Sequence, residues 1–423
     1  MAIDCTRREF LGSTAVAAGA APGSNDRIGF ASIGVGNRGT EHLRVLLKRG
    51  AEENVRVTAV CDVFQRYLNR AVSLSHTEGY LDYRRVLERK DVDAVVIATP
   101  DHWHARIALD ALAAGKHVYL EKPMTLTIEG ALAVRNAVRR TGLALQVGPQ
   151  WTADDAFWKA QAAIRRGSIG KVTWAQSGLG RNFRECLFNA PPFRIDPSVG
   201  PQSAGDAYVD WDMWLGHRFG LAPKIPFNPE HFFRFRKYWA YSGGLATDLL
   251  YHRLAPMLLA IAGPNGEYPQ RVQCAGGLYV EKDGRDIPDT ILYTIDYPSE
   301  FSVFLVSTLT NSTQVPTRIY GKHGTMEIER VGELTHGGDP VLTANGEFEQ
   351  EFKLANDGYG AVRLVSDVRR DMLGNFIDAI RGKGALYCNA ELGAATMVAI
   401  RMGIDAWRQR KVMTWDAANE RVI

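Results

Sequence analysis

The feature that most constrains the fold is a run of three glycines between an apolar segment and a helical one. Gly34, Gly36 and Gly39 form the pattern G-x-G-x-x-G. They follow a short apolar run that is typical of a buried strand, and they precede a segment whose apolar residues share one side of a helix. Asp62 ends the next apolar run, 23 residues after Gly39. Because glycines at these places let the backbone approach a pyrophosphate at a helix N-terminus, the pattern predicts a dinucleotide-binding turn.

The residues around this turn indicate which dinucleotide it takes. Asp62 would accept hydrogen bonds from the adenosine ribose hydroxyls and repel a 2′-phosphate, which favours NAD over NADP. Arg66, four residues later, would soften that preference. Further contacts are expected from loops that follow the third and fourth strands, at the sheet edge where such folds bind ligands. The expected cofactor-binding residues are Gly34, Gly36, Asn37, Arg38, Gly39, Asp62, Arg66, Thr99, Pro100, His102, His104, Glu121 and Lys122.

Strands and helices alternate through the first 150 residues, and the pattern changes after them. Apolar runs at 55–62, 93–99 and 117–120 are separated by amphipathic segments, which predicts βαβ units and a parallel sheet covered on both faces. In the second half, alternating runs such as 291–297 and 301–308 predict strands of an antiparallel sheet. The sequence therefore indicates an α/β protein with two different sheets.

Composition excludes several classes of protein. The chain has 50 basic and 47 acidic residues, and a net charge of +3 gives no reason to expect nucleic-acid binding. No uninterrupted apolar run reaches the length of a membrane span, so stable membrane insertion is not expected. The five cysteines are scattered without metal-ligand spacing, and no metal site is expected.

The first 26 residues differ from the rest and are expected to be an export signal with a short linker. Residues 6–11 (TRREFL) resemble a twin-arginine signal, and an Ala- and Gly-rich run follows, with a small-residue cleavage-like site at 18–20. This predicts the twin-arginine export machinery as a partner and a periplasmic or otherwise exported location. The alternative is an amphipathic first helix of the mature fold.

Two further segments carry candidate chemistry. Lys122 lies between Glu121 and a proline at the end of a buried strand, where its ammonium could donate to a substrate hydroxyl oxygen. Asp248 and His252 lie four apart on an expected helix and therefore share one face. Three interpretations of that pair stay open: metal ligands, an Asp that holds a core His, or a general acid/base His oriented by the Asp.

Taken in chain order, these motifs resemble the Gfo/Idh/MocA oxidoreductases, the family of glucose–fructose oxidoreductase and inositol dehydrogenase. The resemblance implies an N-terminal Rossmann parallel sheet in residues 27–149. It also implies a C-terminal α+β domain in residues 150–423, with a large, mostly antiparallel open sheet. The matching segments are 34–39, Asp62, 99–104, 121–123 and Gly244-x-x-x-Asp248-x-x-x-His252, and segments 210–216 and 375–380 are similar to exported bacterial members.

The resemblance also implies roles for residues. Lys122 is expected to be the catalytic lysine, with Asp248 and His252 as its partners, and the chain is expected to form a homo-oligomer. The expected substrate contacts are Gln150, Trp239, Tyr241 and His252, and the candidate bases are His252, Tyr241 and His231. One departure from the resemblance is Trp151 after Gln150, where exported relatives often have arginine.

Three functions follow as hypotheses. The first is an NAD-dependent oxidoreductase that acts on a secondary hydroxyl of a sugar, glycoside or cyclitol and holds its cofactor tightly, because an exported enzyme has no abundant pool of free NAD. The second is an NAD-dependent glycoside hydrolase that uses transient C3 oxidation, elimination, water addition and hydride return. The third is a non-catalytic protein that retains NAD and binds sugar.

Overall fold

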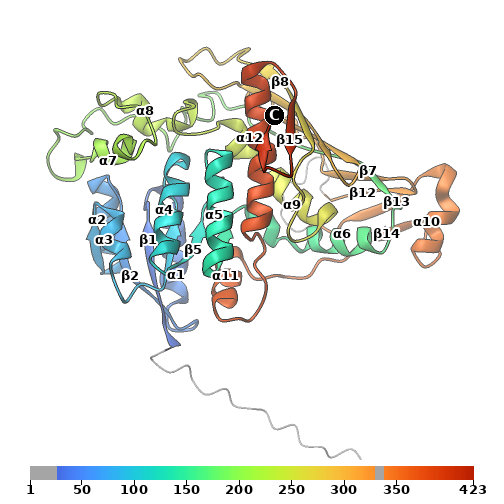
Figure 1. The fold of residues 1–423 in the computed structure, drawn as a ribbon, viewed down its shortest axis with the longest axis horizontal. Coiled ribbons are helices and arrows are strands. Elements are labelled where there is room, and N and C mark those ends of the chain that lie inside the picture. Colours follow the sequence, from blue (N-terminus) through green and yellow to red (C-terminus); the bar gives the residue numbers. More distant parts are fainter. Residues whose placement is uncertain (1–25, 329–337) are drawn as a thin grey trace, which may run out of the picture.

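The computed structural model of the chain describes residues 26–328 and 338–423. The expected export signal lies outside the described residues, apart from Asp26. Within the described residues, two sheets divide the chain near residue 150 (Figure 1). This arrangement confirms the predicted α/β fold class.

The first sheet is a six-stranded parallel sheet with the strand order β3-β2-β1-β4-β5-β6. Every residue of β1 and of β4 is buried, as expected for strands that helices cover on both faces. The short edge strand β3 is an element that sequence reasoning missed. The strands are β1 (Ile28–Ile33), β2 (Val55–Cys61), β3 (Glu78–Tyr80), β4 (Ala94–Ile97), β5 (His117–Leu120) and β6 (Leu145–Val147), and the helices are α1 (Asn37–Arg49), α2 (Gln65–Ser75), α3 (Tyr83–Leu87), α4 (Asp101–Ala113) and α5 (Ile128–Thr141).

The second sheet has ten described strands in the order β14-β13-β12-β11-β7-β10-β9-β8-β15-β16. Its strand pairs are antiparallel except for β7 and β10, which run parallel. The sheet is therefore mostly antiparallel, as predicted. Side chains of β10 alternate between buried and half-buried, so helices cover one face of the sheet. The strands are β7 (Val172–Gly180), β8 (Arg271–Gly277), β9 (Thr290–Tyr297), β10 (Phe301–Thr308), β11 (Arg318–Gly321), β12 (Gly324–Glu327), β13 (Val341–Ala344), β14 (Ala361–Arg363), β15 (Met413–Asp416) and β16 (Arg421–Val422).

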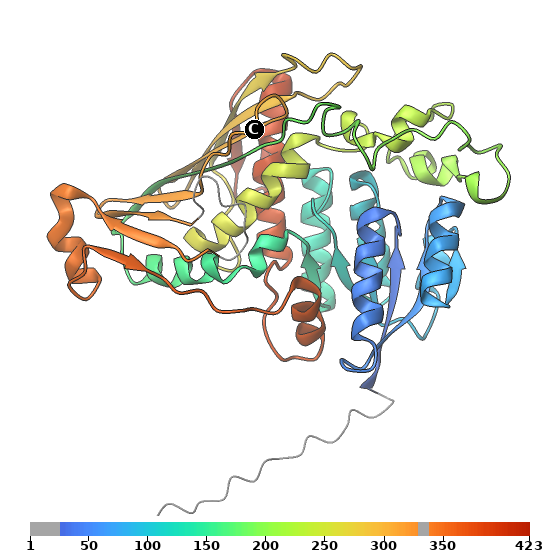
Figure 2. The ribbon, with the colours of Figure 1, turned by 180° about the vertical axis from the view of Figure 1, so that it is seen from behind.

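Helix α12 joins the two sheets, because it packs against α5 on one side and β8 on the other (Figure 2). Helix α9 packs beside α12 and against α6, and it also contacts β7 of the second sheet. In the described residues, no helix is both long enough and apolar enough to cross a membrane. The helices of the second half are α6 (Asp155–Arg165), α7 (Trp211–Leu215), α8 (Pro229–Phe233), α9 (Tyr251–Ala262), α10 (Glu349–Ala355), α11 (Met372–Ile380) and α12 (Ala390–Gln409).

Residues 181–241, here named the cap segment, lie over the carboxyl ends of the first sheet (Figure 1). The amide of Gln65 donates to the carbonyl of Tyr208 at 2.9 Å, and the amide of Asp210 donates to the carbonyl of Val63 at 2.9 Å. Buried aromatic side chains of the cap segment pack around Phe64 in a cluster of their own. The cap segment therefore closes the edge at which the sequence predicts a dinucleotide.

Candidate active site

The glycine turn has the geometry that the sequence predicts. Gly34 has φ +80°, and a Cβ there would lie 2.8 Å from the carbonyl carbon of Ala98. A Cβ on Gly39 would lie 1.8 Å from the carbonyl oxygen of Gly34, so the helix can approach the strand only without one. Gly36 is the N-cap residue of α1, and no side chain caps this helix. Uncapped N–H groups at a helix N-terminus are suited to a pyrophosphate.

A cavity beneath the cap segment begins at this turn. Its lining combines the glycine turn, the carboxyl ends of β1, β2 and β4, and aromatic side chains from the cap segment. The Thr99 hydroxyl in this lining is buried and has no hydrogen-bond partner among the described residues, which leaves it available to a ligand. These features fit a dinucleotide. Of the expected cofactor residues, the lining contains Gly34, Gly36, Asn37, Arg38, Asp62, Thr99 and Pro100.

Asp62 lies where an adenosine ribose would lie, but it also supports the turn. Its Oδ2 accepts the Val35 amide at 2.8 Å, and its Oδ1 accepts the Phe64 amide at 2.9 Å. Burial raises the pKa of Asp62 to about 6, although these backbone donors oppose the shift. Each carboxylate oxygen keeps acceptor capacity for a ribose hydroxyl.

Arg66 does not line the cavity. Its Nη1 donates to Asp196 at 2.6 Å and its Nε donates to Asp206 at 3.2 Å, so two carboxylates of the cap segment bind it. We expected Arg66 to soften the preference for NAD over NADP. The structure instead uses the guanidinium to fasten the cap segment to α2.

Glu121 does not line the cavity, but it binds Arg38, which does. Its Oε1 accepts from Arg38 Nε at 2.8 Å and lies 2.6 Å from His42 Nε2, while its Oε2 accepts the Lys122 amide at 3.1 Å. Burial opposes ionisation, yet His42 and Arg38 hold the pKa of Glu121 well below its ordinary value. Glu121 therefore links α1 to the loop that carries Lys122.

His102 and His104 do not line the cavity, and their ring nitrogens contact backbone carbonyl groups of nearby segments. His102 Nε2 lies 2.9 Å from the carbonyl oxygen of Trp214, and burial lowers the pKa of His102 to about 4. The ring nitrogens of His104 lie 2.6 Å from the carbonyl oxygen of Pro123 and 2.9 Å from that of Thr99. Both histidines thus hold loops in place, where the sequence predicted cofactor contacts.

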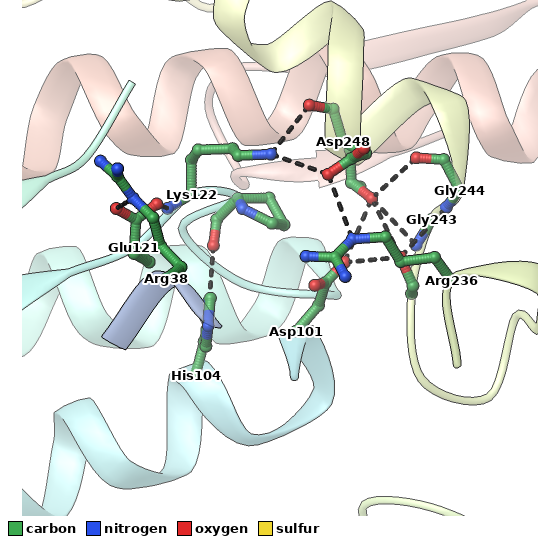
Figure 3. A network of polar contacts seen from close by, with 12 residues as sticks. Arg38, Asp101, His104, Glu121, Lys122, Arg236, Gly243, Gly244 and Asp248 are labelled. Carbon is green, nitrogen blue, oxygen red and sulfur yellow. Dashed lines mark hydrogen bonds and ion pairs between the residues drawn. The ribbon is translucent and has the colours of Figure 1, made fainter. Parts of the chain in front are cut away.

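Lys122, Asp248 and Arg236 form the ionic centre of the site (Figure 3). Lys122 Nζ donates to Asp248 Oδ1 at 2.9 Å and to the Asp248 carbonyl oxygen at 2.8 Å. Arg236 Nε donates to the same Oδ1 at 3.2 Å, and Arg236 also lines the cavity. Burial opposes ionisation of Asp248, but the two cations hold its pKa well below the ordinary range. Asp248 is therefore a permanent anion that positions Lys122.

His252 completes the trio that the sequence predicts. Asp248 lies in a π-helical turn, Ala246–Leu250, and His252 follows in α9. Burial first, and then the charge of Lys122, lower the pKa of His252 to about 3. No hydrogen bond to the His252 imidazole exists within residues 26–328 and 338–423, and its ring lies against Trp151 with centroids 5.8 Å apart. His252 is thus a neutral imidazole with free ring nitrogens.

Two contributors to the site were missed by sequence reasoning. Arg236 gave no signal, because it lies in a generic aromatic and basic run and meets Asp248 only through the fold. Asp101 is buried, and its Oδ2 accepts from Ser242 Oγ at 2.8 Å and from Thr247 Oγ1 at 3.2 Å. Asp101 thereby fastens α4 to the turn that carries Asp248 (Figure 3). Its position in the motif at 99–104 was the available clue.

The structure does not bring the expected substrate contacts together at one place. Gln150 begins a short 3-10 turn, Gln150–Ala153, that follows β6, and its neighbour Trp151 contacts the His252 ring. Trp239 donates its indole N–H to the Asp286 carbonyl at 2.7 Å and packs toward α12. Tyr241 is only 1% exposed, burial raises its pKa to about 12, and its hydroxyl lies 3.1 Å from His231 Nδ1. Trp239 and Tyr241 are both outside the cavity lining.

The described residues contain no group of three or more His, Cys, Asp or Glu side chains arranged to hold a metal ion. Asp248 is instead occupied by two cations. The two ion pairs explain why a carboxylate is buried at this position, and they require no metal ion.

Comparison with known proteins agrees with the geometry of the first sheet. A family model described as an oxidoreductase family with an NAD-binding Rossmann fold matches residues 28–149. The matching model is that of the Gfo/Idh/MocA oxidoreductases, so residues 28–149 are similar to the NAD-binding domain of that family. The family match confirms the expected cofactor, NAD.

Similar proteins are named as glycoside hydrolases or as dehydrogenases. A glycosyl hydrolase family 109 protein of Shewanella baltica is 38% identical and an alpha-N-acetylgalactosaminidase of Shewanella oneidensis is 37% identical, each over 125 residues. These matches span 27% of the chain and only 26% of each relative. The WlbA dehydrogenase of Bordetella pertussis, solved with NADH and UDP-GlcNAcA, shares the fold with TM-score 0.64 and 16% identity, over 92% of this chain and 99% of that one.

Proposed function

We propose that the protein is an NAD-dependent oxidoreductase that acts on a secondary hydroxyl of a sugar, glycoside or cyclitol. The observation that carries the proposal is the bond between Lys122 and Asp248, because the same carboxylate also accepts from Arg236 in the lining of a cavity that begins at a dinucleotide turn. Two of the three N–H groups of the ammonium are used on Asp248, and the third is free for a substrate oxygen. Bound NAD would supply the hydride acceptor.

The side chains divide the work of the reaction. The Lys122 ammonium donates to the substrate hydroxyl oxygen and stabilises the negative charge that develops there. The lowered pKa leaves His252 unprotonated near neutral pH, which is the form needed to accept the hydroxyl proton, although the same shift makes the imidazole a weaker base. Asp248 holds the ammonium in place and does not take the proton, since its own pKa is depressed.

The proposal includes a cofactor that stays on the protein. The cap segment covers the cavity, and its bonds to Val63, Gln65 and Arg66 fasten it to α2 and to the connection between β2 and α2. A retained cofactor agrees with the export and periplasmic location that we infer from residues 6–11. Such an enzyme needs a second substrate to reoxidise the cofactor, or it must return the hydride to the first.

A second candidate function is a redox-assisted glycosidase, in which oxidation of the sugar is transient and the net reaction is hydrolysis. The names of the two Shewanella relatives favour it, within the 125 residues that match. The same Lys122, Asp248 and His252 contacts would serve its oxidation step. A non-catalytic sugar-binding protein has no need of a free ammonium N–H and a neutral imidazole that share the partner Asp248.

One experiment separates these functions. The protein is purified without added cofactor, its bound NAD is quantified, and it is incubated with aryl glycosides and with free sugars. A stable ketosugar together with reduced bound cofactor supports the oxidoreductase. Aglycone release without added NAD supports the glycosidase and overturns the oxidoreductase. Bound NAD with neither product across the sugar panel overturns both.

A further inference from the structure

Arg236 presents an unused edge of its guanidinium at the cavity. Its Nε donates to Asp248 Oδ1 at 3.2 Å, and the side chain is 26% exposed in the lining. Within residues 26–328 and 338–423, the two terminal nitrogens of Arg236 have no hydrogen-bond partner. Four N–H donors of this half-buried cation therefore have no acceptor on the protein.

Two aromatic rings border the Arg236 guanidinium. The ring centres of Phe193 and Phe235 lie 5.5 Å and 4.6 Å from Arg236 Cζ. These rings attract the cation and restrict the orientation of its plane, but they offer no lone pairs to the N–H donors. A guanidinium with a restricted plane presents its paired donors as a fork, which matches the two oxygens of a carboxylate.

The charges around Asp248 leave an excess of positive charge. One carboxylate serves both Lys122 and Arg236, and all three side chains are at most 26% exposed. The other cation of the lining, Arg38, is matched by Glu121 at 2.8 Å and by Glu41 at 2.7 Å. An anion in the cavity would therefore meet uncompensated positive charge at Arg236.

We propose that Arg236 binds a carboxylate of the substrate, so that the enzyme acts on a sugar acid in preference to a neutral sugar. The inference rests on the proposed function, because that function places the substrate beside Lys122 and Asp248. The cofactor pyrophosphate is the other anion to consider, but its expected place is the N-terminus of α1. Arg236 instead shares one carboxylate oxygen with the lysine that faces the substrate.

Calorimetric titration of the NAD-loaded protein tests the inference. Three pairs of methyl glycosides serve as probes: glucuronide with glucoside, galacturonide with galactoside, and mannuronide with mannoside. At least one uronide should bind about 10- to 100-fold more tightly than its neutral partner, as expected for a bidentate charged hydrogen bond. Arg236→Gln should reduce that ratio to within about twofold, and Arg236→Lys, which keeps the charge without the fork, should give an intermediate ratio.

Arg194→Gln is the matched control, because Arg194 is an exposed guanidinium of the same segment that pairs with Glu185. It should keep the full preference. Equal binding within all three pairs, a preference that survives Arg236→Gln, or loss of NAD from that variant would each overturn the inference. If Arg236→Gln does not fold, an undiminished preference in Arg236→Lys overturns it. Turnover of the same sugars is measured separately: a preference without turnover overturns the proposed function and leaves the carboxylate site standing.

Discussion

Lys122 reaches Asp248 across 126 positions of sequence, and this contact decides where its ammonium lies. The side chain is 12% exposed, so an ion pair here is better shielded from solvent than one at the surface. Because two of its N–H groups are fixed on Asp248, the direction of the third is fixed as well. A donor that is oriented in advance costs no reorganisation when charge develops on the substrate oxygen.

Lys122→Met should reduce the rate of cofactor reduction by a sugar by about 100- to 1,000-fold, the typical effect of losing one oriented donor. NAD should remain bound, since Lys122 is outside the cavity lining. Single-turnover absorbance gives the rate, and cofactor released on denaturation gives the occupancy. Lys171→Met is the control, because Lys171 is exposed and pairs with Glu300. A variant with full activity would show that Lys122 is not catalytic.

The low pKa of His252 predicts an unusual pH profile. Burial and the charge of Lys122 lower this pKa to about 3, so the imidazole is unprotonated and able to accept a proton from about pH 4 upward. The value of kcat/KM should therefore show no loss on going from pH 7 to pH 5, with NAD occupancy monitored in the same samples. An acid limb centred near pH 6.5, the ordinary value for histidine, would contradict the assignment.

Elements differ in how far short-range sequence determines them. The glycine turn, the parallel strands and Asp62 were predictable, because each depends on neighbours within one βαβ unit. The role of His102 and His104 was not, since a histidine that supports a loop and one that contacts a cofactor look alike in a sequence. Arg236 and the π-helical turn were missed for a related reason: both depend on packing between distant segments.

Packing of α1 on β1 gives the sharpest prediction at the element scale. A Cβ on Gly39 would lie 1.8 Å from the Gly34 carbonyl oxygen. Because this oxygen belongs to the backbone, the clash can be relieved only if α1 moves away from β1. Gly39→Ala should lower the free energy of unfolding by about 1–3 kcal/mol and abolish NAD binding. Denaturant unfolding and cofactor content measure the two effects. Gly384→Ala should change neither, because its Cβ would meet nothing within 4 Å.

At the scale of the whole molecule, the two sheets meet through α12, and the cap segment runs from the end of β7 in the second sheet to the residues that follow β2 in the first. The sequence indicated the two kinds of sheet, but the position of the cap segment was not predictable. Its few regular elements give no periodicity, and its bonds to Val63 and Gln65 join backbone groups that any residues would carry. The expected homo-oligomer stays a prediction, since nothing in one chain tests it.

The cap segment should set how slowly NAD leaves, and the Arg66 ion pairs provide a way to test this. Asp196 and Asp206 bind Arg66 at partly exposed positions, so each pair contributes modestly, about 0.2–1 kcal/mol. Removing both by Asp196→Asn with Asp206→Asn should speed NAD dissociation about two- to tenfold. The effect is limited because the backbone bonds to the first sheet remain.

The dissociation rate follows from a chase of NAD-loaded protein with labelled NAD. Glu185→Gln is the matched control, because it removes an exposed ion pair within the cap segment that makes no bridge to the first sheet. If the control and the double variant release NAD at the same rate as the unaltered protein, the cap segment does not retain the cofactor. Retention of NAD, as proposed above, would then need another structural cause.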